Sequence, residues 1–118
     1  MSPRAAARRQ RTAVLAGAAP VFAALGDETR LALVARLSAG GPMSIARLTE
    51  GTKVTRQAIT KHLAVLSDAG LAHGTRVGRD RVWEIEARRL DDARRWLDHI
   101  ERQWDEALGR LKAALESE

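Results

Sequence analysis

The side chains best suited to binding chemistry lie at the start of a segment that begins at Thr55. Apolar residues recur along this segment at helical spacing, which predicts a helix with one buried face. Four polar side chains lie on the opposite face of its first two turns: Arg56, Gln57, Thr60 and Lys61. Arginine, glutamine and threonine can hydrogen-bond to base edges in a DNA major groove, and lysine suits the phosphates. The pattern therefore indicates a helix whose exposed face could contact duplex DNA.

A second basic group surrounds the tripeptide Gly78-Arg79-Asp80. Beyond it Trp83 and Ile85 fall on one face and the intervening residue on the other, which predicts a strand and, with the glycine, a β-hairpin. Three arginines flank the tip: Arg76, Arg79 and Arg81. A basic hairpin of this kind can lie along the DNA backbone or in the minor groove, as the wing of a winged helix does.

The distribution of charge favours a polyanionic partner for the middle of the chain. The 118 residues carry a formal net charge of +5, and the pI is about 10.9. Residues 53–82 hold six basic and two acidic side chains, whereas residues 84–118 hold seven basic and ten acidic ones. Exposed arginine and lysine on one helix are often only a solvated surface. A short helix expected after Ser44, just before the helix at Thr55, adds to the basic hairpin and this regional charge. Together these features favour nucleic acid.

The composition argues against an enzyme. Cysteine and tyrosine are absent, which excludes disulfides, thiolate metal sites and nucleophilic cysteine. Ser67 and Asp68 lie five and six residues from His62 on the same expected helix, so no catalytic triad follows. No glycine-rich phosphate loop is present. We therefore expect neither an enzymatic activity nor a cofactor.

The uncharged stretch Ala13–Leu25 follows several arginines and superficially resembles a secretory signal. It is shorter than the roughly 20 apolar residues that span a bilayer. The apolar pattern also continues beyond it as far as Leu37. We expect no membrane association and a cytoplasmic location.

The elements that must position these side chains indicate one mainly α domain. We expect an α+β winged helix-turn-helix of about five helices with a two-stranded β-hairpin as its wing. Residues 1–12 form a basic N-terminal arm, residues 13–86 the DNA-binding domain and residues 87–118 a C-terminal dimerisation helix. The arginines of the arm could follow the duplex or could simply keep the chain soluble.

Caps and helix breakers set the expected boundaries. The first core helix should run from about Ala18 to Leu25, with Pro20 in its first turn, where the missing N–H costs nothing. Three residues are the expected N-caps of further helices: Asp27, Ser44 and Thr55. The helix after Asp27 should reach Ser38, and the one after Thr55 should end in a Schellman motif at Gly70.

The C-terminal segment, from about Ala87 to Glu116, carries a heptad repeat of apolar residues. Such a helix could simply cover its own domain. The stripe exceeds what a small domain needs, so we expect it to pair with a second copy. Trp104 could also line an inducer pocket at the dimer interface, although packing is its favoured role. The residues of this helix expected at the dimer interface are Leu90, Trp96, Leu97, Ile100, Trp104, Leu108 and Leu111.

Two sequence blocks resemble the arsenical-resistance-repressor (ArsR) family of bacterial regulators. They are Pro20–Leu31 and Ile59–Leu71, and the segment Arg79–Ile85, with Trp83 where an aromatic residue is usual, extends the similarity. The resemblance covers about Ala18 to Ala87. It implies a winged helix-turn-helix that dimerises through its first and last helices and binds operator DNA, often as a repressor released by an inducer.

The resemblance also implies roles for particular residues. Arg56, Gln57, Thr60 and Lys61, at the end that begins with Thr55, would face the major groove, and Arg79 and Arg81 would be wing contacts. His62 occupies the usual histidine position of the recognition helix, for which we expect a structural or phosphate-contact role. Phe22, in the first helix, joins the expected dimer interface.

Metal sensing, which is common in that family, is not expected here. The position of the usual thiolate pair is occupied by Ile45-Ala46-Arg47-Leu48, which offers no ligand. In the last helix His99 is the only histidine, with Arg102 and Gln103 three and four residues on. These residues do not supply the four ligands of a tetrahedral zinc site, so we expect no metal site.

The sequence therefore predicts a homodimeric, sequence-specific DNA-binding transcriptional regulator of the repressor type. Its expected partners are a palindromic double-stranded operator and a second copy of the chain, with an unidentified small-molecule inducer as a candidate ligand. The alternative is a winged-helix module used for protein–protein contacts in a regulatory complex.

Overall fold

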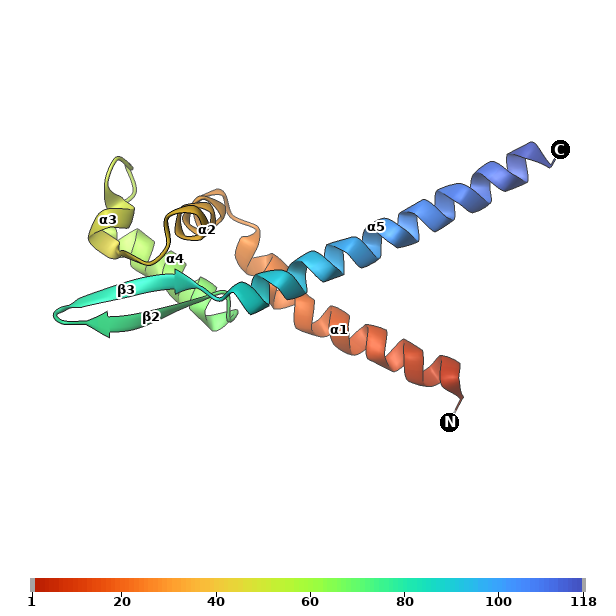
Figure 1. Cartoon of the computed structure of the whole chain (residues 1–118), viewed down its shortest axis with the longest axis horizontal. Helices are drawn as coiled ribbons and strands as arrows, with labels where there is room; N and C mark the ends of the chain where they lie inside the picture. The colour runs from red at the N-terminus through yellow and green to blue at the C-terminus, as the bar shows by residue number, and fades with distance from the viewer. Residues whose placement is uncertain (1, 118) are drawn as a thin grey trace.

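The computed structural model describes residues 2–117, with their side chains except those of residues 10–16. The side chain of Arg11 in the basic arm thus lies outside the described residues. In chain order the elements are α1 (Pro3–Leu25), α2 (Glu28–Gly40), β1 (Met43–Ser44), α3 (Ile45–Thr49), α4 (Arg56–Asp68), β2 (Ala72–Val77), β3 (Asp80–Ile85) and α5 (Ala87–Glu116). Over the described residues, five helices and a small antiparallel sheet confirm the expected mainly α winged helix-turn-helix (Figure 1).

The core lies where α2, α3 and α4 meet the sheet and the C-terminal end of α1. Its apolar side chains come from every one of these elements, so the small domain is held by one continuous cluster. The most deeply buried large side chains are Leu48, Ile59, Leu63, Leu66, Leu71 and Val21. Three of them lie on α4 at the predicted i, i+4 and i+7 spacing, which fixes the face that this helix turns inward.

The sheet has three strands in the order β1-β3-β2, all antiparallel. The predicted two-stranded wing is confirmed as β2 and β3. A third strand, which was not predicted, joins the sheet because Met43 of β1 pairs with Trp83 of β3. Asp80 was expected in the hairpin tip but pairs with Val77, leaving a two-residue turn of Gly78 and Arg79. Gly78 has φ +62°, a conformation that glycine adopts at little cost and that suits a tight hairpin.

The predicted helix caps are confirmed. The side chains of Asp27, Ser44 and Thr55 accept the backbone N–H three residues on, at 2.9, 3.2 and 3.1 Å. Gly70 ends α4 with φ +77°, and the N–H of Leu71 donates to the carbonyl of Leu66 at 2.9 Å, as a Schellman motif requires. Helix α2 continues to Gly40, two residues beyond the expected end.

The first helix is much longer than predicted. It begins at Pro3 instead of Ala18, with Ser2 as its N-cap, so the basic segment is helical from Pro3 onward. Pro20 consequently lies inside the helix and not in its first turn. Alanine is the best helix former and abounds here. Because the segment carries no apolar stripe, periodicity alone gave no sign of this helix.

Helix α5 matches its predicted bounds and extends far beyond the domain. It crosses α1 near Phe22 and Trp96, whose ring centroids lie 5.7 Å apart. Beyond this crossing, the N-terminal part of α1 and the rest of α5 project away from the winged helix (Figure 1). The molecule therefore measures 67 × 36 × 20 Å, an elongated shape for a small domain.

Candidate nucleic-acid interface

Helix α4 presents the predicted polar face to solvent. Its buried residues fix its rotation, and the opposite side chains of its first two turns are all exposed: Arg56, Gln57, Thr60 and Lys61. Thr55 is exposed at the N-cap. The Thr60 hydroxyl donates to the carbonyl of Arg56 at 2.8 Å, so its oxygen remains able to accept a hydrogen bond. Donors and acceptors suited to base edges and phosphates thus share one exposed surface.

The turn between α3 and α4 is held by a residue that sequence reasoning missed. Arg36 of α2 donates to the carbonyls of Leu48 and Arg47, at 2.7 and 3.1 Å. These carbonyls lie at the end of α3, where the helix leaves acceptors without internal donors. Arg36 therefore ties α3 to α2 and fixes the first helix of the helix-turn-helix pair. The turn also exposes Lys53, a further cation beside α4.

His62 is set apart from the other predicted contact residues. Its Nδ1 lies 3.2 Å from Arg30 Nη1 and 3.8 Å from Asp27 Oδ2, at the junction of α1 and α2. Arg30 Nε also donates to the carbonyl of Ala24 at the end of α1. The ring is half-buried. Of the two roles expected for His62, this geometry favours the structural one.

The wing brings the three predicted arginines close together. Arg76 and Arg81 are direct partners across the β2–β3 ladder, and Arg79 lies in the turn. All three are exposed. Like charges placed opposite each other on two strands are destabilising. A bound anion would therefore reduce the repulsion between Arg76 and Arg81. The guanidinium carbon of Arg81 lies 5.2 Å from the centroid of the Trp83 ring, which places the side chain along the sheet.

The helix-turn-helix and the wing lie at one end of the molecule, and the free ends of α1 and α5 lie at the other (Figure 1). A duplex at the first end could meet α4 and the hairpin tip together. The second end carries the predicted dimer residues that α5 exposes, Leu97, Trp104, Leu108 and Leu111. The fold thus places the wing and the exposed apolar side chains of α5 at opposite ends of the molecule.

The predicted dimer residues fall into two groups. Phe22 and Leu90 pack against the core of their own chain, and Trp96 contacts Phe22. Ile100 is half-buried. From Leu97 onward α5 exposes a stripe of large apolar side chains, including Trp104 at 64% exposure. The members of this exposed stripe are Leu97, Trp104, Leu108, Leu111 and Leu115.

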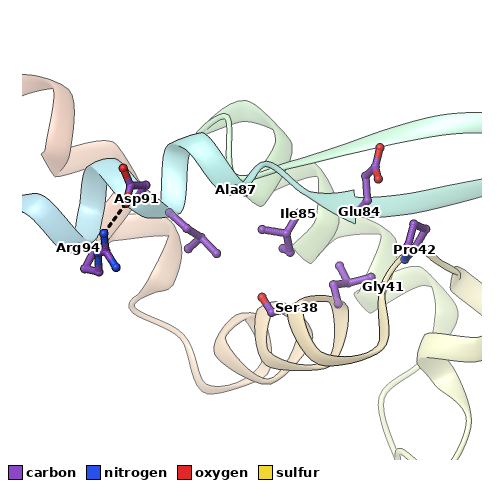
Figure 2. Close-up of a pocket in the computed structure, with 10 residues that line it drawn as sticks. Ser38, Gly41, Pro42, Glu84, Ile85, Ala87, Asp91 and Arg94 are labelled. Carbon is purple, nitrogen blue, oxygen red and sulfur yellow. Dashed lines mark hydrogen bonds and ion pairs between the residues drawn. The ribbon is translucent and has the colours of Figure 1, made fainter.

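A shallow pocket of about 490 Å³ lies between the end of α2, strand β3 and the start of α5 (Figure 2). Leu37, Ile85 and Leu90 give it apolar surface. Trp104, expected at the dimer interface, does not line this pocket and is exposed on α5. The pocket lies between the DNA-binding domain and the first turns of α5.

The charged groups of this pocket are already paired. Asp91 accepts from Arg94 at 2.9 Å and from Arg95 at 2.6 Å, and Glu84 lies 2.6 Å from His73 Nε2. The hydrogen bond from Arg95 is the main reason that the pKa of the Asp91 carboxyl lies below its ordinary value. Because its charged groups carry both signs and already have partners, the pocket does not indicate a particular class of ligand.

Among the described residues, no group of three or more histidine, cysteine, aspartate or glutamate side chains could hold a metal ion. Over the same part of the chain, no helix has the length and apolar character needed to span a bilayer.

Comparisons with known proteins agree with this geometry. A helix-turn-helix domain model matches residues 25–75. The HTH-type transcriptional regulator Rv2034 of Mycobacterium tuberculosis is 37% identical over 95 residues, which cover 80% of this chain and 85% of that protein. The solved ArsR-like transcriptional regulator from Rhodococcus sp. RHA1 has a TM-score of 0.72 at 37% identity, with 83% of this chain and 92% of the other covered. The chain belongs to the ArsR family. A second ArsR family transcriptional regulator, RHA00566, has a TM-score of 0.65 at 30% identity, covering 80% and 93% of the two chains.

Membership of the ArsR family confirms the resemblance seen in the two sequence blocks. The matched helix-turn-helix model runs from the end of α1 into β2 and so includes all of α4. This ArsR-family chain is therefore a DNA-binding transcriptional regulator.

Proposed function

We propose that this ArsR-family regulator is a homodimer that binds a palindromic operator in the cytoplasm and represses transcription from it. The observation that carries the proposal is the exposed polar face of α4, with its buried face fixed by the core, beside a wing with three exposed arginines. Arg56 and Gln57 would contact base edges, and Lys61 and Arg79 would contact phosphates.

The dimer follows from the exposed stripe on α5. Leu97 is 54% exposed and Trp104 64% exposed in the single chain, and three leucines continue the stripe. An uncovered apolar surface of this size on a projecting helix favours self-association. A twofold axis through paired α5 helices would present two α4 helices to one duplex, roughly 34 Å apart. Such a dimer requires an operator with inverted half-sites.

Selection of bound duplexes from a random DNA pool, using the purified full chain, tests this function. We expect an inverted repeat, bound with an affinity that falls steeply with salt because several phosphates per subunit are neutralised. The alternative, a protein–protein module, predicts no duplex binding at moderate salt and a different protein bound to α5. Recovery of no common sequence, or an affinity indifferent to salt, would contradict the proposal.

A further inference from the structure

The indole N–H of Trp83 is a buried donor without an acceptor. Trp83 is only 7% exposed, and its Nε1 is the one buried side-chain nitrogen or oxygen that lacks a hydrogen-bond partner among the described residues. A buried donor left unpaired destabilises the free protein, so native structures keep few of them. This N–H would therefore be satisfied by a hydrogen-bond acceptor from another molecule.

The surroundings of the ring show where such a partner would enter. Gly74 faces Trp83 across the ladder, and a Cβ at Gly74 would lie 3.2 Å from both Cζ2 and Cε2, the latter being the ring atom bonded to Nε1. The same Cβ would lie 2.7 Å from Nε of Arg81. The exposed Arg81 side chain thus fills the space over Gly74 and covers the Cε2–Cζ2 edge of the indole, next to Nε1.

The cations of the wing lie on the same face of the sheet as this N–H. Residues two apart on a strand share a face, so Arg81 accompanies Trp83. Arg76 lies opposite Arg81, as Gly74 lies opposite Trp83. Two guanidinium groups and one neutral donor therefore meet on one side of the hairpin. An anion with several acceptor oxygens could accept hydrogen bonds from more than one of them.

We propose that Trp83 Nε1 and the guanidinium of Arg81 together bind a phosphodiester oxyanion of the DNA backbone at the base of the wing. Arg81 moves from above the ring to the phosphate, and this movement opens the indole N–H to a phosphate oxygen. The site rests on the proposed DNA binding and adds a contact that is independent of base sequence. Gly74 allows Arg81 and the ring to pack this closely, because any side chain there would meet both of them.

Nuclear magnetic resonance of the full chain tests the contact directly. The protein has three tryptophans and hence three indole N–H signals, and the variant Trp83→Phe assigns the relevant one. A mixed-sequence duplex of about 20 base pairs, two helical turns, is added at low salt. We expect the Trp83 indole proton to move downfield, while the signals of Trp96 and Trp104 at the α5 end move little.

Affinity measurements give a second readout. We expect Trp83→Phe to weaken binding to all duplexes by roughly tenfold, the loss of one charge-assisted hydrogen bond, with the salt dependence unchanged. Arg81→Gln should weaken binding and also reduce the salt slope by about 1. Gly74→Ala keeps the indole but crowds the ring and Arg81, and should weaken binding in the same way. Thr75→Val, which removes a donor from the other face of the wing, is the matched control.

The outcomes separate this site from the proposed function. Duplex binding that shifts the backbone signals of α4 but leaves the Trp83 indole unmoved would contradict the phosphate site alone. Trp83→Phe binding as tightly as Thr75→Val would do the same. Failure of the unmodified chain to bind any duplex would contradict the proposed function, and the phosphate site with it.

Discussion

At the scale of single residues, three arginines hold the helix layer together by donating to the ends of helices to which they do not belong. Arg30 donates to the last turn of α1, Arg36 to the end of α3 and Arg89 to the carbonyl of Ala69 at the end of α4. Arg89 also donates to Gly17 of α1. Each satisfies carbonyls that a helix end leaves unpaired. The sequence offered no way to distinguish them from solvated arginines, because their acceptors come from distant segments.

Asp27 gives a pH-dependent test of the helix junction. The backbone N–H of Arg30 donates to its carboxylate, which lowers its pKa from the ordinary value of 3.8. A carboxyl with a lower pKa in the folded state stabilises the fold above its unfolded pKa, and this contribution is lost as the pH falls through the folded pKa. We expect Asp27→Asn to flatten the fall in unfolding free energy between about pH 5 and pH 2, measured by urea denaturation. An unchanged pH profile would contradict this assignment.

Arg56 and Arg79 should differ in what they contribute to DNA binding. We expect Arg56→Ala to reduce discrimination between the operator and shuffled DNA by roughly tenfold or more, because a lost base contact is a loss of specificity. Arg79→Ala should instead weaken binding to all sequences alike and lower the salt slope by about 1. Competition binding separates the two effects. Equal effects of both variants on specificity would be inconsistent with these roles.

At the scale of elements, the sequence predicted the features that depend on residues close together in the chain. The caps at Asp27, Ser44 and Thr55, the end of α4 and the rotation of α4 all follow from neighbours within a few residues. Strand β1 is only two residues long and exists because Met43 pairs with Trp83, which lies far along the chain. The length of α1 escaped prediction because alanine favours a helix without leaving an apolar stripe.

Two glycines, one at the end of a helix and one inside a helix, offer a matched test of how glycine affects stability at these positions. Gly70 has φ +77° at the end of α4, so Gly70→Ala should destabilise the protein by about 1–2 kcal/mol. Gly109 lies inside α5 with open space where a Cβ would lie, so Gly109→Ala should stabilise it by about 1 kcal/mol. Chemical denaturation at one protein concentration measures both. Changes of the same sign would argue against these roles for the two positions.

At the scale of the whole molecule, one chain leaves its longest helix half uncovered. The domain core ends near the crossing of α1 and α5, and the apolar stripe continues beyond it to Leu115. The heptad repeat predicted this surface correctly, since it depends only on spacing. The orientation of a second chain against this stripe depends on contacts between the two chains, which the heptad repeat alone does not determine.

Trp104 tests the role of this stripe. We expect the unmodified protein to sediment as a dimer, and Trp104→Glu to raise the dimer dissociation constant roughly 100-fold, because a charge would enter an apolar interface. Trp104→Phe keeps an apolar ring and should remain dimeric. Circular dichroism checks that the domain stays folded. A monomeric unmodified chain, or a dimeric Trp104→Glu variant, would contradict the proposed interface.

The proposed function requires that two outward-facing α4 helices of one dimer contact the same duplex, and a hydroxyl-radical footprint on the selected operator tests this most directly. We predict two protected patches related by a twofold axis and centred about one helical turn apart, roughly 34 Å. Both patches should fade together in Trp104→Glu. A single protected patch without twofold symmetry, or a footprint unchanged in that variant, would contradict the proposed function.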